Sequence, residues 1–218
     1  MTRTFAVVFA AFALLFTRTG APASTQETRP TQAASPATAT VATPLKFKVG
    51  DVWTYSGANG EYLWRIKEVS ADAVLAENST GRTYRFSPDG NLLQGYSGNG
   101  REVNFRPSTK DIKFPLREGT SWDETYSGTG TVTGRKRGDE RPKTWEFRAQ
   151  GRVLGLEEVT VPAGTFKAWK IDHRLKGGDT DEVRKTCWYA EEVKRFVKCT
   201  SETHPAWNFV LVKSVLQK

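Results

Sequence analysis

The stretch TCWYAEEVKRFVKC, residues 186–199, contains both cysteines of the chain and two runs of β-favouring residues around a charged turn. A turn centred on Val193 places Cys187 directly opposite Cys199 in an antiparallel hairpin, at a Cα separation that a disulfide can span. The stretch therefore predicts a disulfide-closed β-hairpin. Two buried free thiols are the alternative.

This hairpin register makes two further predictions. Tyr189 lies opposite Val197 on the face of the cysteines, and Trp188 lies diagonal to Phe196 on the other face. A disulfide across so short a loop stabilises a fold by roughly 3 kcal/mol on the chain-entropy model. Disulfides persist in oxidising compartments, so the pair also predicts an extracytoplasmic protein.

Short strands are predicted throughout the rest of the chain. The run YLWRIK at residues 62–67 alternates large apolar residues with others at period two, which is typical of a strand. Turn signals recur every eight to twelve residues or so, at 57–60, 79–81, 88–90, 98–100, 128–130, 135–141, 162–164 and 177–178. Regular short strands between glycine and proline turns predict an all-β sandwich, barrel or strongly curved sheet of about twelve strands.

A weak internal repeat supports this architecture. FKVGDVW at residues 47–53 is echoed by LREGTSW at residues 116–122, and each copy is followed shortly by Tyr-Ser-Gly. In each copy we expect the glycine to turn the chain and the tryptophan to open a strand and face the core. A duplicated half-barrel and a coincidence both remain open.

The N-terminal region predicts export. Arg3, the apolar run Phe5–Phe16 and the small residues at 21–23 predict a signal peptide over residues 1–23. Residues 24–44 are rich in Ala, Pro and Thr and predict a disordered linker. Residues 45–218 then form a single β-rich domain, periplasmic or secreted, with no transmembrane segment predicted because no apolar run is long enough.

The net charge is +8, and it falls to +6 when residues 1–23, with two arginines and no acid, are removed. A basic surplus favours anionic lipid, cell-wall polymer or nucleic acid as a partner. The interpretation we retain is a solvated basic surface, with no nucleic-acid partner.

No pattern in the sequence predicts catalysis. The only histidines, His173 and His204, have no metal-ligand spacing around them, and no Gly-x-Ser-x-Gly elbow or phosphate loop occurs. We therefore predict no catalytic residue, no metal and no cofactor, and a protein that is not an enzyme.

Aromatic residues are the enriched class, with seven Trp, six Tyr and twelve Phe. Alternation in strands predicts that most of them pack in the core. Trp64, Trp145 and Trp169 are the candidates for lining a ligand site on a concave sheet face.

The run VTVPAGTF at residues 159–166, followed by WYA at 188–190 and FVK at 196–198, resembles the TapB-like family of exported bacterial proteins of unknown function. The chain departs from that pattern at Glu191, where proline is frequent, and at Lys194, where glycine is frequent. The resemblance implies an antiparallel, half-barrel-like domain, loosely similar to carriers that hold lipids or lipoproteins in a curved sheet. It implies no catalytic residues.

Together these observations predict an all-β protein with an antiparallel curved sheet, a half-barrel or barrel-like meander. The predicted function is a non-enzymatic binding or carrier module for an apolar or amphipathic ligand in the cell envelope. One alternative is an assembly or scaffold module that binds another envelope protein or polymer. The other is a hydrolase of cell-wall or sugar material, which requires two carboxylates roughly 5 to 10 Å apart in a cleft. The sequence does not predict an oligomeric state.

Overall fold

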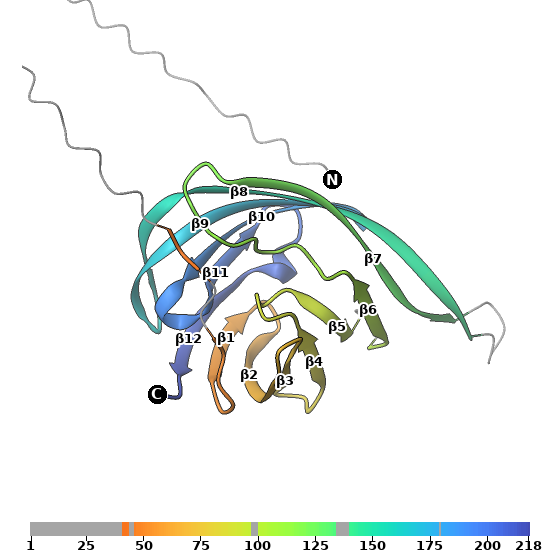
Figure 1. Cartoon of the computed structure of the whole chain (residues 1–218), viewed down its shortest axis with the longest axis horizontal. Coiled ribbons are helices and arrows are strands. Elements are labelled where there is room, and N and C mark those ends of the chain that lie inside the picture. Colours follow the sequence, from red (N-terminus) through yellow and green to blue (C-terminus); the bar gives the residue numbers. More distant parts are fainter. Residues whose placement is uncertain (1–40, 44–45, 97–99, 134–139, 179) are drawn as a thin grey trace, which may run out of the picture. The chain divides into compact units, whose positions relative to one another are not determined.

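The computed structural model describes residues 41–43, 46–96, 100–133, 140–178 and 180–218. Twelve strands and two short 3₁₀ turns form the regular structure of these residues (Figure 1). The elements are β1 (Val52–Gly57), β2 (Gly60–Val69), β3 (Val74–Asn78), β4 (Thr83–Phe86), β5 (Leu92–Tyr96), β6 (Glu102–Arg106), β7 (Ser121–Thr133), β8 (Glu140–Val161), β9 (Gly164–Gly177), β10 (Thr180–Ala190), η1 (Glu191–Val193), β11 (Arg195–Ser201), η2 (Pro205–Trp207) and β12 (Phe209–Val215).

The strands form a closed antiparallel barrel. Each strand pairs with its neighbours in the sequence, and β12 returns to pair with β1, where Val52 lies opposite Val215. This confirms the prediction of an all-β antiparallel meander of about twelve strands, in its barrel form. The fold follows from the period-two pattern, because one face of each strand turns to the interior and the other to solvent.

The predicted disulfide is confirmed: Cys187 in β10 and Cys199 in β11 are bonded and lie directly opposite each other. The register closer to the turn differs from the prediction, because Tyr189 pairs with Phe196 and not with Val197. The turn comprises residues 191–194, so Ala190 pairs with Arg195 beside it. This pairing is shifted by one residue relative to the Cys187–Cys199 pair. A β-bulge absorbs the difference.

The bulge also separates two residues that the sequence placed diagonally on one face. Trp188 packs in one hydrophobic cluster and Phe196 packs against another. The first cluster comprises Phe47, Trp53, Tyr55, Ile66, Val74, Ala76, Phe86, Val159, Val161, Ala168, Trp188, Ala190, Val193, Val197 and Leu211. The second comprises Ala42, Ile112, Leu116, Trp122, Val153, Trp169, Ile171 and Tyr189.

The tryptophans of the internal repeat belong to different clusters. Trp53 is buried in the first and Trp122 in the second. Each follows a glycine with positive φ, Gly50 at 89° and Gly119 at 81°, a conformation that suits glycine because it has no Cβ. The predicted roles of the glycine and the tryptophan are therefore confirmed, while the origin of the repeat stays open.

The segment between β6 and β7 packs against the second cluster. Asn91 holds this segment with two hydrogen bonds to the backbone of Ile112, at 2.8 and 3.0 Å. Ala42 forms a β-bridge with Leu116, and both side chains are buried. Residues 41–43 of the predicted linker are described, and Ala42 among them packs in the second cluster. The signal peptide and the rest of the linker lie outside the described residues and stay predictions.

Candidate functional site

A cavity of about 710 Å³ lies at the end of the barrel that carries the β1–β2, β3–β4 and β11–β12 connections. Its walls come from segments far apart in the sequence, which the closed meander brings together. The lining residues are Gly57, Ala58, Asn59, Gly60, Glu61, Tyr62, Trp64, Ser79, Thr80, Tyr96, Lys185, Cys199, Ala206, Trp207, Asn208 and Phe209.

Five aromatic side chains dominate this lining. Tyr62 and Trp64 are alternate residues of β2 and therefore share one face of the strand. Contacts behind the cavity wall fix their orientation: Tyr62 stacks on Tyr55 at a centroid distance of 5.6 Å, and Trp64 meets Tyr84 edge-on at 4.5 Å. The rings thus form a wall supported by the packed interior.

Phe209, Tyr96 and Trp207 complete the aromatic wall. Phe209 contacts Tyr55 edge-on at 5.1 Å and sits opposite Cys199 in the β11–β12 pair. Trp207 ends the η2 turn and is 41% exposed. An exposed tryptophan beside a cavity is a frequent feature of binding sites, because its large flat surface gains much from being covered.

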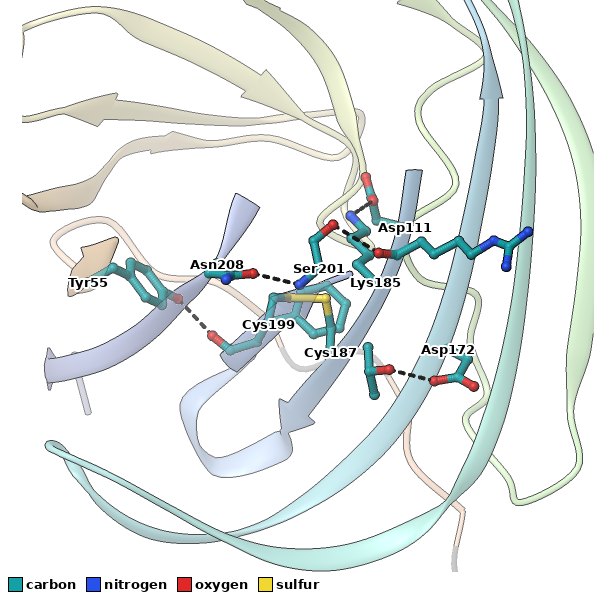
Figure 2. Close-up of a disulfide and its surroundings, with 11 residues drawn as sticks. Tyr55, Asp111, Asp172, Lys185, Cys187, Cys199, Ser201 and Asn208 are labelled. Carbon is teal, nitrogen blue, oxygen red and sulfur yellow. Dashed lines mark hydrogen bonds and ion pairs between the residues drawn. A yellow bond between two sulfur atoms is a disulfide. The ribbon is translucent and has the colours of Figure 1, made fainter. Parts of the chain in front are cut away.

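Lys185 is the cation of the lining. Its Nζ donates to Oδ1 of Asp111 at 2.7 Å and lies 5.0 Å from the ring centroid of Trp207. Figure 2 shows this pair beside the Cys187–Cys199 disulfide. Only 11% of the Lys185 side chain is exposed, so Asp111 stabilises an ammonium that has lost most of its water.

His173 lies directly opposite Lys185 in the β9–β10 pair. Its ring contacts Trp122 and Phe196, and its Nε2 is buried without a hydrogen-bond partner among the described residues. Burial lowers the pKa of His173, the charge of Lys185 lowers it further, and Asp111 opposes them, leaving a pKa of about 3. His173 is therefore neutral near pH 7.

Two other pKa values near the cavity follow from their surroundings. Desolvation acts to raise the pKa of Asp111, but the charge and hydrogen bond of Lys185, the charge of His173 and a hydrogen bond from Thr109 together outweigh it and lower the pKa to about 2. Burial, with a smaller contribution from Tyr55, raises the pKa of Tyr62 to about 12. Tyr62 therefore presents a protonated hydroxyl at the cavity at neutral pH.

The structure separates the three tryptophans that the sequence proposed as lining residues. Trp64 lines the cavity. Trp169 is 2% exposed in the second cluster and donates to Oε1 of Glu191 at 3.2 Å. Trp145 lies in β8 opposite Gly128, away from this lining, with the ammonium of Lys143 5.2 Å from its ring centroid. Contact of any of the three with a ligand stays a prediction.

Sequence reasoning missed Tyr62, Tyr96, Trp207, Phe209 and Lys185 as lining residues. Tyr62 had a usable signal, since it is two residues before Trp64 in the same alternating run. The other four residues had no sequence signal, because the tertiary structure of the barrel brings them together.

The lining offers little for catalysis. Glu61 is the one carboxylate among the described residues that line the cavity. A separate hollow of about 130 Å³ is lined by Asp172, His173 and Glu202 together with Arg174, Arg184, Lys185 and Thr186. The Nε2 of His173 is nevertheless buried, and Asp172 accepts a hydrogen bond from Thr186 at 2.7 Å. Among the described residues, no three His, Cys, Asp or Glu side chains are grouped to hold a metal.

No protein-family model and no curated protein matches the chain. The hypothetical lipoprotein YmcC from Escherichia coli K12 is similar in structure, with a TM-score of 0.47 and 12% identity over 78% of this chain and 89% of that chain. The resemblance to the TapB-like family is not confirmed by these comparisons.

Two further structures are similar at a lower level. A candidate exported protein with a YmcC-like fold from Bacteroides fragilis NCTC 9343 gives a TM-score of 0.41, with 15% identity over 80% of this chain and 99% of that chain. A candidate lipoprotein from Parabacteroides distasonis ATCC 8503 gives 0.36, with 14% identity over 78% and 97%. Likeness at these levels carries no conclusion about function. In the part of the chain that the structure describes, no helix combines the length and apolarity needed to cross a membrane.

Proposed function

We propose that this protein is an exported, non-catalytic binding module that holds one amphipathic small molecule in the aromatic cavity. The observation that carries the proposal is the cavity itself, about 710 Å³ with five aromatic side chains in its lining. Small-molecule sites usually occupy roughly 300–1,000 Å³ and combine apolar walls with a few polar groups that orient the ligand.

The disulfide supports export. Cys187–Cys199 is bonded, and such bonds persist in oxidising compartments outside the cytoplasm. Cys199 itself lines the cavity, so the cross-link also holds together the two strands beside it. Periplasmic and secreted locations both fit this argument.

The alternatives have less support. Assembly through an open sheet edge is disfavoured because β1 pairs with β12 and closes the sheet. Hydrolysis by paired carboxylates is disfavoured because Glu61 is the one acid in the described lining of the cavity. Binding needs only the cavity and its wall.

The test is native mass spectrometry of the protein purified from the compartment to which it is exported, with two matched variants. Ala206→Trp places a large ring in the cavity wall, whereas Val69→Trp places the same ring at an exposed site outside the lining. We expect a small-molecule adduct on the wild type and Val69→Trp and its loss from Ala206→Trp.

A second measurement tests the cavity for binding when the natural ligand has been lost during purification. Titration with the amphipathic dye 1-anilinonaphthalene-8-sulfonate should give one-to-one binding that Ala206→Trp weakens at least about tenfold and Val69→Trp leaves unchanged. The proposal is wrong if the wild type shows neither an adduct nor dye binding, or if both variants behave alike.

A further inference from the structure

We propose that the ligand of the aromatic cavity is a saccharide whose pyranose ring stacks on the aromatic wall, an inference that rests on the binding function proposed above. A sugar ring has apolar C–H faces and a polar rim of hydroxyl groups. It therefore requires flat apolar surfaces with hydrogen-bonding groups between them.

The apolar part of the lining is flat and not aliphatic. Among the described residues that line the cavity, no Leu, Ile, Val or Met occurs, and the large apolar side chains are all aromatic. Flexible aliphatic side chains adapt to acyl chains, whereas rigid rings present planar surfaces. The rings come from β2, β5, η2 and β12, so a ligand meets them from several directions.

Trp207 is the stacking surface best placed for a ligand. It is the one aromatic residue among the strongly exposed large apolar side chains of the described chain, at 41%. Lys185 covers one side of its ring, with Nζ 5.0 Å from the centroid. Covering the remaining exposed surface with the C–H face of a sugar would remove it from water.

Polar side chains share the cavity lining with the rings. Asn59, Ser79, Thr80 and Asn208 line the same cavity. Oδ1 of Asn208 accepts a hydrogen bond from the backbone N–H of Ser201 at 2.6 Å, which fixes the orientation of the amide. Its Nδ2 has no acceptor among the described residues and is thus left to donate to a ligand hydroxyl.

The charges of the lining do not select an ion. Lys185 is already paired with Asp111 at 2.7 Å, and the remaining charged residue of the lining is Glu61, of opposite sign. The faces of Tyr96 and Trp207 are also approached by protein cations, Arg82 at 4.9 Å and Lys185 at 5.0 Å, which disfavours a cationic ligand. A neutral, hydroxyl-rich ligand matches this balance.

The test uses three kinds of probe on the full protein. The first is a panel of free disaccharides: cellobiose, maltose, lactose and N,N′-diacetylchitobiose. The second is octyl β-glucoside below its micelle concentration, which represents the sugar head of a glycolipid. The third is octanoate, which offers the chain without the sugar. Calorimetry measures affinity, and saturation-transfer NMR identifies the ligand protons that contact the protein.

We expect at least one sugar probe to bind, with saturation strongest on the ring C–H protons. Trp207→Ala should weaken binding about tenfold, on the order of the loss of one aromatic stacking surface, while Leu154→Ala, which truncates a similarly exposed apolar side chain outside the lining, should leave it unchanged. Asn208→Asp keeps the oxygen that accepts from Ser201 but removes the amide donor, so it should also weaken binding.

The outcomes separate the two proposals. Binding of free disaccharides identifies a soluble sugar, and binding of octyl glucoside alone with saturation on the sugar ring identifies a glycolipid head group. If octanoate binds in the cavity and no sugar probe does, the saccharide inference is wrong and the binding module stands. If no probe binds and the dye and adduct tests also fail, both proposals are wrong.

Discussion

Two Lys–Asp ion pairs, Asp51–Lys194 and Asp111–Lys185, join distant segments of this barrel and differ in how deeply the carboxylate is buried and in which groups donate to it. Their N···O distances are 3.0 and 2.7 Å, and the lysine side chains are about equally buried, at 13% and 11% exposed. The Asp51 side chain is 0% exposed, whereas 39% of the Asp111 side chain is exposed.

The partners of the two carboxylates explain the contrast. Asp51 accepts hydrogen bonds from Lys194 and from the backbone N–H groups of Lys48 and Gln217, at 2.8–3.0 Å. It therefore ties the start of β1 to the η1 turn and to the end of the chain. Asp111 accepts hydrogen bonds from the side chains of Lys185 and Thr109 and holds no backbone N–H group in the hydrogen bonds described. A buried carboxylate that holds two backbone N–H groups indicates a structural role, whereas Asp111 mainly stabilises the buried Lys185 ammonium.

The largest expected effect is on Asp51. Asp51→Ala should lower the free energy of unfolding by about 3–5 kcal/mol, because it leaves the Lys194 ammonium and two backbone N–H groups without their acceptor. Urea denaturation measures this change. Asp111→Ala is the matched comparison and should cost about 2 kcal/mol: it leaves the mostly buried Lys185 ammonium without its partner, but the carboxylate that it removes is itself partly solvated and holds no backbone N–H groups. Equal losses in the two variants would contradict the distinction between the pairs.

The fold was predictable because its information is local. The alternation of residues 62–67 and the glycine turns specify short antiparallel strands without reference to distant residues. The cysteine pair was predictable for the same reason, since only 12 positions separate the two residues. The β-bulge was not, because it resolves a conflict between turn length and disulfide register that composition does not reveal.

The cavity was predictable only in part. Trp64 belongs to the alternating run, so its inward direction followed from the sequence. Its proximity to Trp207 and Lys185 depends on closure of the barrel between β1 and β12, which no local pattern encodes. The same applies to the Asp51–Lys194 pair, whose members are 143 positions apart.

The next largest expected effect is a loss of stability in acid, caused by His173 and Asp111 near Lys185. The folded protein protonates His173 near pH 3, whereas the unfolded chain does so near 6.5. Between these values the unfolded state binds more protons, so stability falls as pH falls, by up to about 1.4 kcal/mol per pH unit. Asp111 adds a loss at lower pH: its pKa is lowered from 3.8 to about 2, so its stabilisation is present above 3.8 and lost as pH falls toward 2.

His173→Phe tests this assignment. The variant keeps an aromatic ring between Trp122 and Phe196 but cannot take up a proton. The free energy of unfolding of the variant, relative to that of the wild type, should rise by about 2 kcal/mol as the pH is lowered from 6.5 to 4.5. Urea denaturation at each pH measures this difference. Parallel profiles for the wild type and His173→Phe would contradict the assignment.

The smallest expected effect is a difference in stability between two variants of Lys194, which separates the contribution of its side chain from the strain of its backbone. Lys194 has φ 62° and ψ 15°, the left-handed conformation, which glycine adopts most readily. Such a conformation costs a non-glycine residue roughly 1–2 kcal/mol. Lys194→Ala loses the ammonium at Asp51 and keeps the strain, whereas Lys194→Gly loses the ammonium and relieves the strain. We therefore expect Lys194→Gly to be about 1 kcal/mol more stable than Lys194→Ala in urea denaturation.

Because the two backbone N–H groups still reach Asp51, both variants should remain more stable than Asp51→Ala. If Lys194→Ala matches Asp51→Ala instead, the ammonium and not the backbone donors holds this carboxylate in place.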